Sequence, residues 1–303
     1  MLGRRILRIK AFKALYSYAE NPSMTLKDVE SLLDISCEAT RDLYLFMLSI
    51  AGPLTAEARS RIEAARSKFN PTEEERHPNL KFVENSIAPL LAEDPDFSKI
   101  IKRRKMSWDQ YDVFLRHLYE SVREKDYFRA YLASPERSLA EDAALFSKIF
   151  EEEFVDSTEL EDILEDLSIY WNDDLAYALT FCCKTMHDLG AGKRWALPDL
   201  YQSEMKHDAA LQSDKAFVFG VVRTGYNHFE EFYDAVSENT RKWDKNRICV
   251  TDLALIISGL AEAKAFPDTP KRIVINEYVE ISKFYSTPES SAFVNGLLDK
   301  LIP

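Results

Sequence analysis

Apolar residues recur along most of the chain at intervals of three and four, which places them on one face of an α-helix. The pattern starts in the first turn and continues to Asn21-Pro22, where proline disfavours the helical conformation in the residue before it. Thr25 then has the position of a helix N-cap, with Asp28 three residues later. The stripe of the first helix that would face a core consists of Leu7, Ala11, Ala14, Leu15 and Tyr18.

Helical periodicity covers much of the remaining chain, with interruptions at polar or proline-containing stretches. Residues 68–81 contain two prolines and are predicted to form a loop, and Gly52-Pro53 is predicted to break a strongly apolar helix. The fold class that follows is all-α, built from packed helical bundles. The further predicted helices span residues 41–50, 82–91, 107–132, 139–154, 158–170, 173–188 and 248–266.

The scarcity of glycine supports this fold class. The chain has 303 residues and eight glycines, whereas average usage of about 7% would give about 21. Few glycines permit few left-handed turns, which argues against β-sandwiches, barrels and glycine-rich nucleotide-binding folds. Neither a P-loop nor a G-x-G-x-x-G motif is present.

Cysteine and histidine do not indicate a metal or redox site. The four cysteines have no C-x-x-C spacing and are typical of reduced thiols in a cytosolic protein. Cys183 and His187 would share a helix face, but no second pair has ligand spacing. Without a recognisable nucleophile–base arrangement, we expect neither catalysis nor a cofactor.

The chain shows no targeting or membrane segment. Acids and bases interrupt any apolar run near the N-terminus, so no signal peptide is predicted. The most apolar stretch, residues 248–266, contains Asp252, Glu262 and Lys264, which indicates a buried helix rather than a membrane span. We therefore expect a cytoplasmic protein.

The formal net charge of −12 is unevenly distributed. Residues 136–174 contain 14 acids and two bases, so this segment alone accounts for −12. It could be a solvated helix face, a docking site for a basic protein, or a strip that keeps RNA on one side. In contrast, no acid precedes Glu20 in the N-terminal segment. The bases there, near the positive end of a helix dipole, form a predicted anion site: Arg4, Arg5, Arg8, Lys10 and Lys13.

A second basic cluster lies in the middle of the chain. It consists of Lys99, Lys102, Arg103, Arg104 and Lys105. The cluster could extend an RNA-binding track, but a solvated loop or helix end explains the same pattern.

The C-terminal sequence carries the most specific motifs. It contains Ile275-Asn276-Glu277, an amphipathic helix to Tyr285, and then Phe293-Val294-Asn295-Gly296-Leu297-Leu298-Asp299. This resembles the NusB family, whose C-terminal pattern is "INEAxELAKxF" followed by "FVNGxLD". The first helix, with Arg4-Arg5-x-x-Arg8 and then Ala14-Leu15-Tyr16-Ser17-Tyr18, is similar to the family's arginine-rich helix ending in "ALYxW".

The resemblance covers residues 1–22 and 212–303. It implies a NusB-like basic helix and a C-terminal NusB-like bundle, with residues 23–211 forming a helical insertion or an extra bundle. Trp243 and Glu262 fall where the family places an aromatic residue and a "YEL" glutamate. Two departures are Ile257 in place of an arginine and Ala261 in place of the tyrosine.

The resemblance implies RNA binding in transcription antitermination. The family binds boxA-type single-stranded RNA of nascent ribosomal transcripts together with ribosomal protein NusE, and couples it to RNA polymerase. Asp252 would face the protein partner or, on the residues alone, be buried with a hydrogen-bonding partner. The implied RNA-binding residues, of which Lys10 is the least fixed by the family pattern, are Arg4, Arg5, Arg8, Lys10, Tyr16, Glu289, Ser290, Ser291 and Phe293.

The residues themselves leave several roles open. Phe12 and Tyr16 could stack on bases or pack between helices. Thr287-Pro288 is predicted to begin the last helix, whose first turn would suit a phosphate or serve only as a cap. Gly296 inside that helix suggests close packing. An alternative for the whole chain is a non-catalytic scaffold that kept the fold without RNA binding.

Overall fold

The computed structural model describes residues 2–201, 213–240 and 248–303. Helices and short connections make up this part of the chain, and it contains no strand, which confirms the all-α fold class. The chain divides into two compact units. The terminal unit combines residues 1–38 with 199–303, and the central unit is residues 39–198. The two ends of the chain therefore belong to the same unit.

The division between the units differs from the predicted boundaries. The family resemblance places one boundary at residue 22, whereas the units divide after residue 38. This point lies inside a continuous helix, α2 (Leu26–Ser49), so no proline or glycine marks it. The other predicted boundary, at 211/212, lies outside the described residues, as does Trp243.

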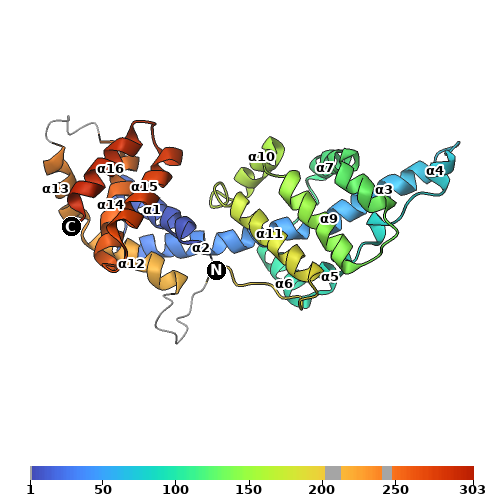
Figure 1. Ribbon diagram of the computed structural model, residues 1–303, viewed down its shortest axis with the longest axis horizontal. Helices are drawn as coiled ribbons and strands as arrows, with labels where there is room; N and C mark the ends of the chain where they lie inside the picture. The colour runs from blue at the N-terminus through green and yellow to red at the C-terminus, as the bar shows by residue number, and fades with distance from the viewer. Residues whose placement is uncertain (1, 202–212, 241–247) are drawn as a thin grey trace. The chain divides into compact units, whose positions relative to one another are not determined.

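The terminal unit is built around α14, whose residues from Asp252 to Glu262 are all buried. Figure 1 shows α1, α12, α15 and α16 packed around it, in agreement with their contacts. The helix is apolar on nearly all sides because it has neighbours on nearly all sides. Besides the first part of α2, the helices of this unit are α1 (Arg4–Glu20), α12 (Asp214–Asn227), α13 (Phe229–Asn239), α14 (Val250–Ala265), α15 (Lys271–Tyr285) and α16 (Ser290–Leu301).

Two glycines allow close helix contacts in this unit. A Cβ atom on Gly225 of α12 would lie 2.6 Å from Leu15 of α1, and one on Gly259 of α14 would lie 2.7 Å from Leu298 of α16. In contrast, a Cβ atom on Gly296 would meet nothing within 4 Å. The close packing predicted for Gly296 is therefore wrong.

The central unit contains the rest of α2 and the helices that follow it, as far as residue 190. A ring stack forms part of its core: the centroids of Phe46 and Trp108 lie 4.1 Å apart. Its elements after α2 are α3 (Ala51–Arg66), α4 (Glu73–Arg76), η1 (Phe82–Glu84), α5 (Ile87–Glu93), α6 (Pro95–Arg104), α7 (Asp112–Glu124), α8 (Asp126–Ala133), α9 (Leu139–Glu152), α10 (Thr158–Leu167) and α11 (Leu175–Gly190).

Three local predictions need correction in this unit. The helix predicted for residues 107–132 is two helices, α7 and α8, because Lys125 is extended (ψ 141°). The loop predicted for residues 68–81 contains the short α4, which a capping box between Thr72 and Glu75 begins. Gly52-Pro53 lies in the first turn of α3, where proline needs no hydrogen-bond donor, so only Ile50 separates α3 from α2.

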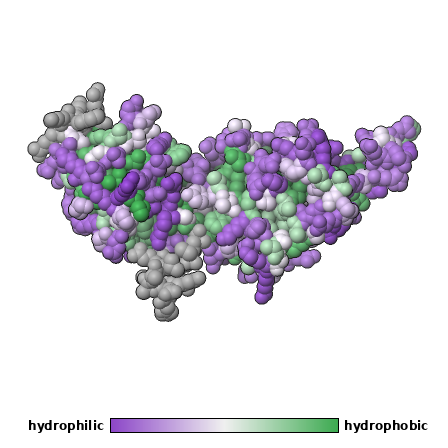
Figure 2. Space-filling view, viewed as in Figure 1, coloured by the Kyte–Doolittle hydropathy of each residue, from purple (hydrophilic) through white to green (hydrophobic). Residues whose placement is uncertain are grey.

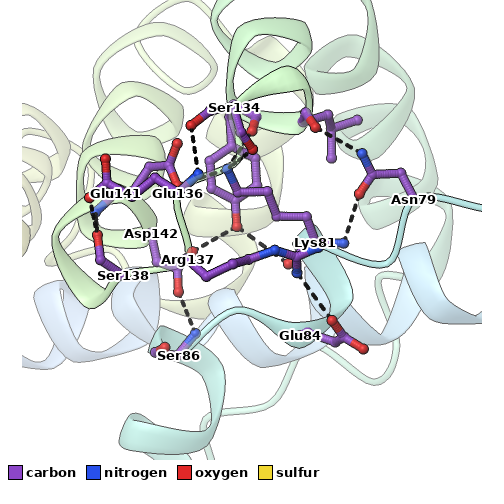
Figure 3. A network of polar contacts seen from close by, with 12 residues as sticks. Asn79, Lys81, Glu84, Ser86, Ser134, Glu136, Arg137, Ser138, Glu141 and Asp142 are labelled. Atoms are coloured by element: carbon purple, nitrogen blue, oxygen red, sulfur yellow. Dashed lines mark hydrogen bonds and ion pairs between the residues drawn. The ribbon is translucent and has the colours of Figure 1, made fainter.

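A buried lysine joins two connections of the central unit (Figure 3). Lys81 donates from Nζ to the carbonyl oxygens of Tyr131 (2.6 Å) and Ser134 (3.0 Å), and it forms an ion pair with Glu141 (2.7 Å). The Tyr131 hydroxyl donates to Asp142 at 2.7 Å. These contacts compensate for burying a charged group, so the network has a structural explanation.

The acidic segment 136–174 forms α9 and α10 and the connections around them. Its exposed acids fit a solvated face, but Asp142 and Asp174 are buried: Asp142 accepts from the backbone N–H of Ser86 at 2.7 Å, and Asp174 from the hydroxyl of Thr40 at 2.6 Å. Hydrophilic residues cover most of the face visible in Figure 2. None of the described helices combines the length and apolar character that crossing a bilayer requires.

Candidate nucleic-acid interface

The predicted basic helix, α1, lies along α15 in the terminal unit. Arg5 near the start of α1 pairs with Glu277, whereas Phe12, two turns later, packs against Tyr285 at a centroid distance of 5.4 Å. The contacts advance in the same direction along both helices, so the helices run parallel at this seam. We call it the α1–α15 seam. The turn at residues 286–289 follows it directly.

At the seam, Arg8 faces inward. Its side chain is 7% exposed, and it donates two hydrogen bonds to Glu262 of α14, Nε to Oε2 at 2.8 Å and Nη2 to Oε1 at 2.7 Å. The hydroxyl of Tyr278 donates to the same carboxylate at 3.1 Å. A third contact, from Arg8 Nη1 to Glu277, measures 3.3 Å. A buried carboxylate in an apolar helix needs such partners.

Arg5 lies at the outer edge of the same network. Its guanidinium forms a bidentate contact with Glu277, at 3.1 Å from Nε and 3.0 Å from Nη2. The Arg5 side chain remains 48% exposed, and that of Glu277 is 21% exposed. Arg5 can therefore meet a solute anion from the solvent side, although Glu277 already neutralises part of its charge.

The network shifts the pKa values of its members. Burial by itself lowers the pKa of Arg8, but the hydrogen bonds and charge of Glu262 more than offset this, so its pKa lies above the usual value. The hydrogen bonds from Arg5 lower the pKa of Glu277. Burial, reinforced by the charge of Glu262, raises the pKa of Tyr278 well above its ordinary value. Arg8 and Glu277 therefore stay charged near neutral pH.

Two further predicted bases are less accessible than the sequence suggested. The guanidinium carbon of Arg4 lies 4.2 Å from the centroid of the Phe217 ring, and partial burial lowers the pKa of Arg4. Lys10 is 3% exposed. Arg8 and Lys10, both assigned to RNA by the resemblance, are therefore buried: they lie on opposite sides of α1, which packs against both α12 and α14.

Aromatic side chains continue the seam beyond the arginines. Phe12 is buried between Tyr16 and Tyr285, so it packs between helices, one of the two roles left open for it. Tyr16 and Tyr285 are half-buried. Nζ of Lys13 lies 5.4 Å from the centroid of the Tyr285 ring. A base and two partly accessible rings thus share one side of α1 and α15.

The turn after α15 is held by Asp252. This residue of α14 is 7% exposed, and its two carboxylate oxygens accept from the hydroxyls of Ser286 (2.6 Å) and Ser290 (2.8 Å). Asp252 is therefore buried with hydrogen-bonding partners, which is the alternative that the residues alone predicted. The carboxylate of Asp252 is not accessible to a protein partner in this arrangement.

The last helix begins later than predicted. α16 starts at Ser290, so Pro288 lies in the turn rather than at the first helical position. The side chain of Thr287 contacts Ser290 at 3.0 Å between oxygens instead of capping a backbone N–H. Ser290 is buried, whereas Glu289 is exposed and Ser291 and Phe293 are half-buried. Of the predicted residues in this turn, Glu289, Ser291 and Phe293 can meet a ligand.

Glu277 and Tyr285 belong to the C-terminal motifs, but the sequence predicted no role for either of them at this seam. Their positions relative to Arg5 and Phe12 depend on the pairing of α1 with α15, which sequence spacing does not report. Glu262 was noted as a charged residue of the apolar stretch 248–266 and by its family position, but no partner was predicted for it. Its place in an otherwise apolar helix was the usable signal, since a buried acid implies a nearby cation.

Comparison with models of protein families matches residues 188–303 of the chain to the NusB family. The match includes α12 to α16, and with them Glu262, Glu277 and the turn held by Asp252. No solved structure matches the chain.

Proposed function

The chain belongs to the NusB family through residues 188–303, and we propose that it is an RNA-binding transcription antitermination factor. At the family level, this membership suggests RNA binding in antitermination without catalysis. The proposed ligand is boxA-type single-stranded RNA of nascent ribosomal transcripts. The proposed partners are ribosomal protein NusE and, through it, the RNA polymerase antitermination complex. Such a role is cytoplasmic.

The arrangement of the α1–α15 seam is the observation that carries this proposal. Arg5 and Lys13 lie on the side of α1 where the rings of Tyr16 and Tyr285 are partly accessible. Bases neutralise phosphates, and aromatic rings stack on unpaired nucleobases, which is how proteins bind single-stranded RNA. The turn with Glu289, Ser291 and Phe293 follows at the end of α15.

Arg8 has a different role in this proposal. Because it is buried against Glu262, it positions α1 and Glu277 instead of contacting phosphate. Asp252 likewise acts through the turn that it holds. Two solvent-facing bases at the seam give a log–log salt slope of about −1.4 from this site, at about −0.7 per contact, whereas five would give about −3.5.

The proposal is tested with a double variant, Arg5→Gln with Lys13→Gln, titrated against boxA RNA by fluorescence anisotropy. The matched control changes Arg223 and Lys264 to Gln, two bases of the terminal unit paired with Glu30 and Glu231. Both variants have the same net charge. Weaker boxA binding by the seam variant alone supports the proposal. Equal affinities of the two variants contradict this site.

A scaffold role is the second candidate, favoured by the burial of Arg8, Lys10 and Asp252. A chain that has lost RNA binding can keep its former binding residues as structural ion pairs. The wild-type chain discriminates between the candidates: a scaffold binds boxA RNA and a scrambled RNA of equal length with the same affinity, with or without NusE.

A further inference from the structure

Helix α6 of the central unit presents an unusual concentration of positive charge. Residues 97–108 contain five bases and no acid, in a chain whose net charge is −12. The helix begins at Asp94, whose side chain accepts from the backbone N–H of Phe97 at 2.6 Å. It ends at Lys105, which adopts the left-handed conformation with φ 54°. All five bases are exposed: Lys99, Lys102, Arg103, Arg104 and Lys105.

The two sides of α6 differ in character. Phe97 is buried, Ile101 is half-buried, and Arg104 on the same side forms an ion pair with Asp42 of α2 (3.4 Å). Lys99, Lys102 and Arg103 lie at i, i+3 and i+4, which is one face of a helix. The structure thus anchors the inner side and leaves a basic outer face. We call Lys99, Lys102, Arg103 and Lys105 the α6 basic face.

Neighbouring acids do not neutralise this face. Within the described part of the chain, none of its four bases forms an ion pair with an acid. Other exposed bases of the central unit do: Arg116 pairs with Asp112, Arg129 with Asp126, and Lys148 with Glu151. Repulsion among four close, unpaired cations destabilises the free protein, and a bound polyanion relieves it.

Helix capping accounts for only part of the cluster. Cations in the last turn interact favourably with the partial negative charge at a helix C-terminus, which applies to Lys102, Arg103 and Arg104. Lys99 lies one turn earlier, and Arg104 is already paired. The dipole therefore explains why the bases are tolerated, but not why the entire outer face is basic.

The chemistry of the α6 basic face selects its ligand. A helix that binds a membrane surface inserts apolar side chains, but the only aromatic residue of α6, Phe97, is buried. Without an exposed aromatic ring, the face has only the guanidinium of Arg103 to stack on a base. A row of phosphates is the ligand that an uninterrupted set of lysines and arginines fits.

We infer that the α6 basic face is a second nucleic-acid contact of this chain, which binds the sugar–phosphate backbone of single-stranded RNA without base preference. This inference rests on the proposed function, because it assumes that the chain meets RNA. The base selectivity would come from the terminal unit, and the α6 basic face would add sequence-independent affinity.

The test compares two full-length triple variants of equal charge. One changes Lys99, Lys102 and Arg103 to Gln, and the control changes Arg116, Arg129 and Lys148 to Gln. Glutamine has nearly the same helix propensity as lysine and arginine, so both variants should fold, which far-UV circular dichroism checks. Affinity for a scrambled single-stranded RNA is measured by anisotropy at several salt concentrations.

The α6 variant should bind the scrambled RNA at least about tenfold more weakly than the control at 0.1 M salt. Its log–log salt slope should be less steep by about 2, from about 0.7 for each of three lost contacts. An affinity and slope equal to those of the control overturn the inference. The inference is also overturned if the wild-type chain binds anionic phosphatidylserine vesicles and the α6 variant loses this binding while its RNA affinity is unchanged.

The same titrations separate this inference from the proposed function. If the wild-type chain does not distinguish boxA from scrambled RNA but the α6 variant binds both more weakly, the antitermination role fails and the α6 contact stands. If the wild-type chain prefers boxA and the α6 variant binds both RNAs as the control does, the antitermination role stands and the α6 contact fails. Absence of RNA binding by the wild-type chain overturns both.

Discussion

Arg8 of α1 and Glu262 of α14 form a bidentate ion pair in the interior of the terminal unit, with distances of 2.8 and 2.7 Å. The pair joins residues 254 positions apart and connects the first helix of the chain to the helix at the centre of the C-terminal bundle. A base that the sequence assigns to RNA therefore belongs to the core, and its loss should act on folding before it acts on binding.

We expect Arg8→Ala to destabilise the chain by about 3–5 kcal/mol, because it leaves the carboxylate of Glu262 buried without its main partner. Replacing both partners, Arg8→Met with Glu262→Leu, should cost much less than the sum of the two single changes, since no unpaired charge remains. Urea unfolding followed by circular dichroism measures both. Additive losses in the double variant would mean that the two charges do not stabilise each other.

Arg5→Ala should cost much less stability than Arg8→Ala. Its pairing with Glu277 is half-exposed, and exposed pairs contribute about 0–1 kcal/mol. Its effect should fall on RNA binding instead. The same unfolding experiment, run beside the anisotropy titration, separates the two arginines. A loss of stability as large as that of Arg8→Ala would make Arg5 a core residue too.

The stability of the terminal unit should fall in mild acid, in part through Glu277. The hydrogen bonds from Arg5 lower the pKa of this carboxyl below its ordinary value of 4.5. A depressed pKa contributes stability above the ordinary value, and that contribution is lost as the pH falls through the folded-state pKa. Unfolding free energies measured between pH 6 and 3 should decrease, and Glu277→Gln should flatten the decrease. The control is Glu280→Gln, which removes an exposed pair with Lys283. Equal profiles for Glu277→Gln and wild type would contradict this coupling.

Asp252→Asn should weaken the turn that follows α15. The carboxylate accepts from Ser286 and Ser290, and an amide has only one oxygen to accept with. We expect a destabilisation of about 1–3 kcal/mol together with weaker boxA binding. Ser31→Ala is the control, because its hydroxyl donates to the carbonyl of Lys27 within α2, outside the proposed site. If NusE binding falls while stability and RNA affinity are unchanged, Asp252 contacts the partner directly.

The fold class and the local helix signals could be predicted from the sequence because they depend on neighbouring residues. Thr25 and Asp28 are an example: each donates a backbone N–H to the other's side chain at the start of α2. The split at Lys125 could not be predicted in the same way, since apolar periodicity continues across α7 and α8.

The candidate site was predictable in composition but not in accessibility. Arginines on α1 indicate an anion site, yet only the pairing of α1 with α14 and α15 shows that Arg8 points to Glu262 and Arg5 to Glu277. The exposure of a side chain depends on tertiary contacts, which the helical wheel of a single helix does not show. The α6 cluster shows the reverse case, because its four unpaired bases became distinctive only once their neighbours were known.

The most direct test of the proposed function is the ratio of the dissociation constants for scrambled and boxA RNA, measured by anisotropy with the wild-type chain at one salt concentration. We expect a ratio well above one that rises further when NusE is added. A ratio of one, unchanged by NusE, would contradict it and would leave a NusB-family scaffold without RNA selectivity.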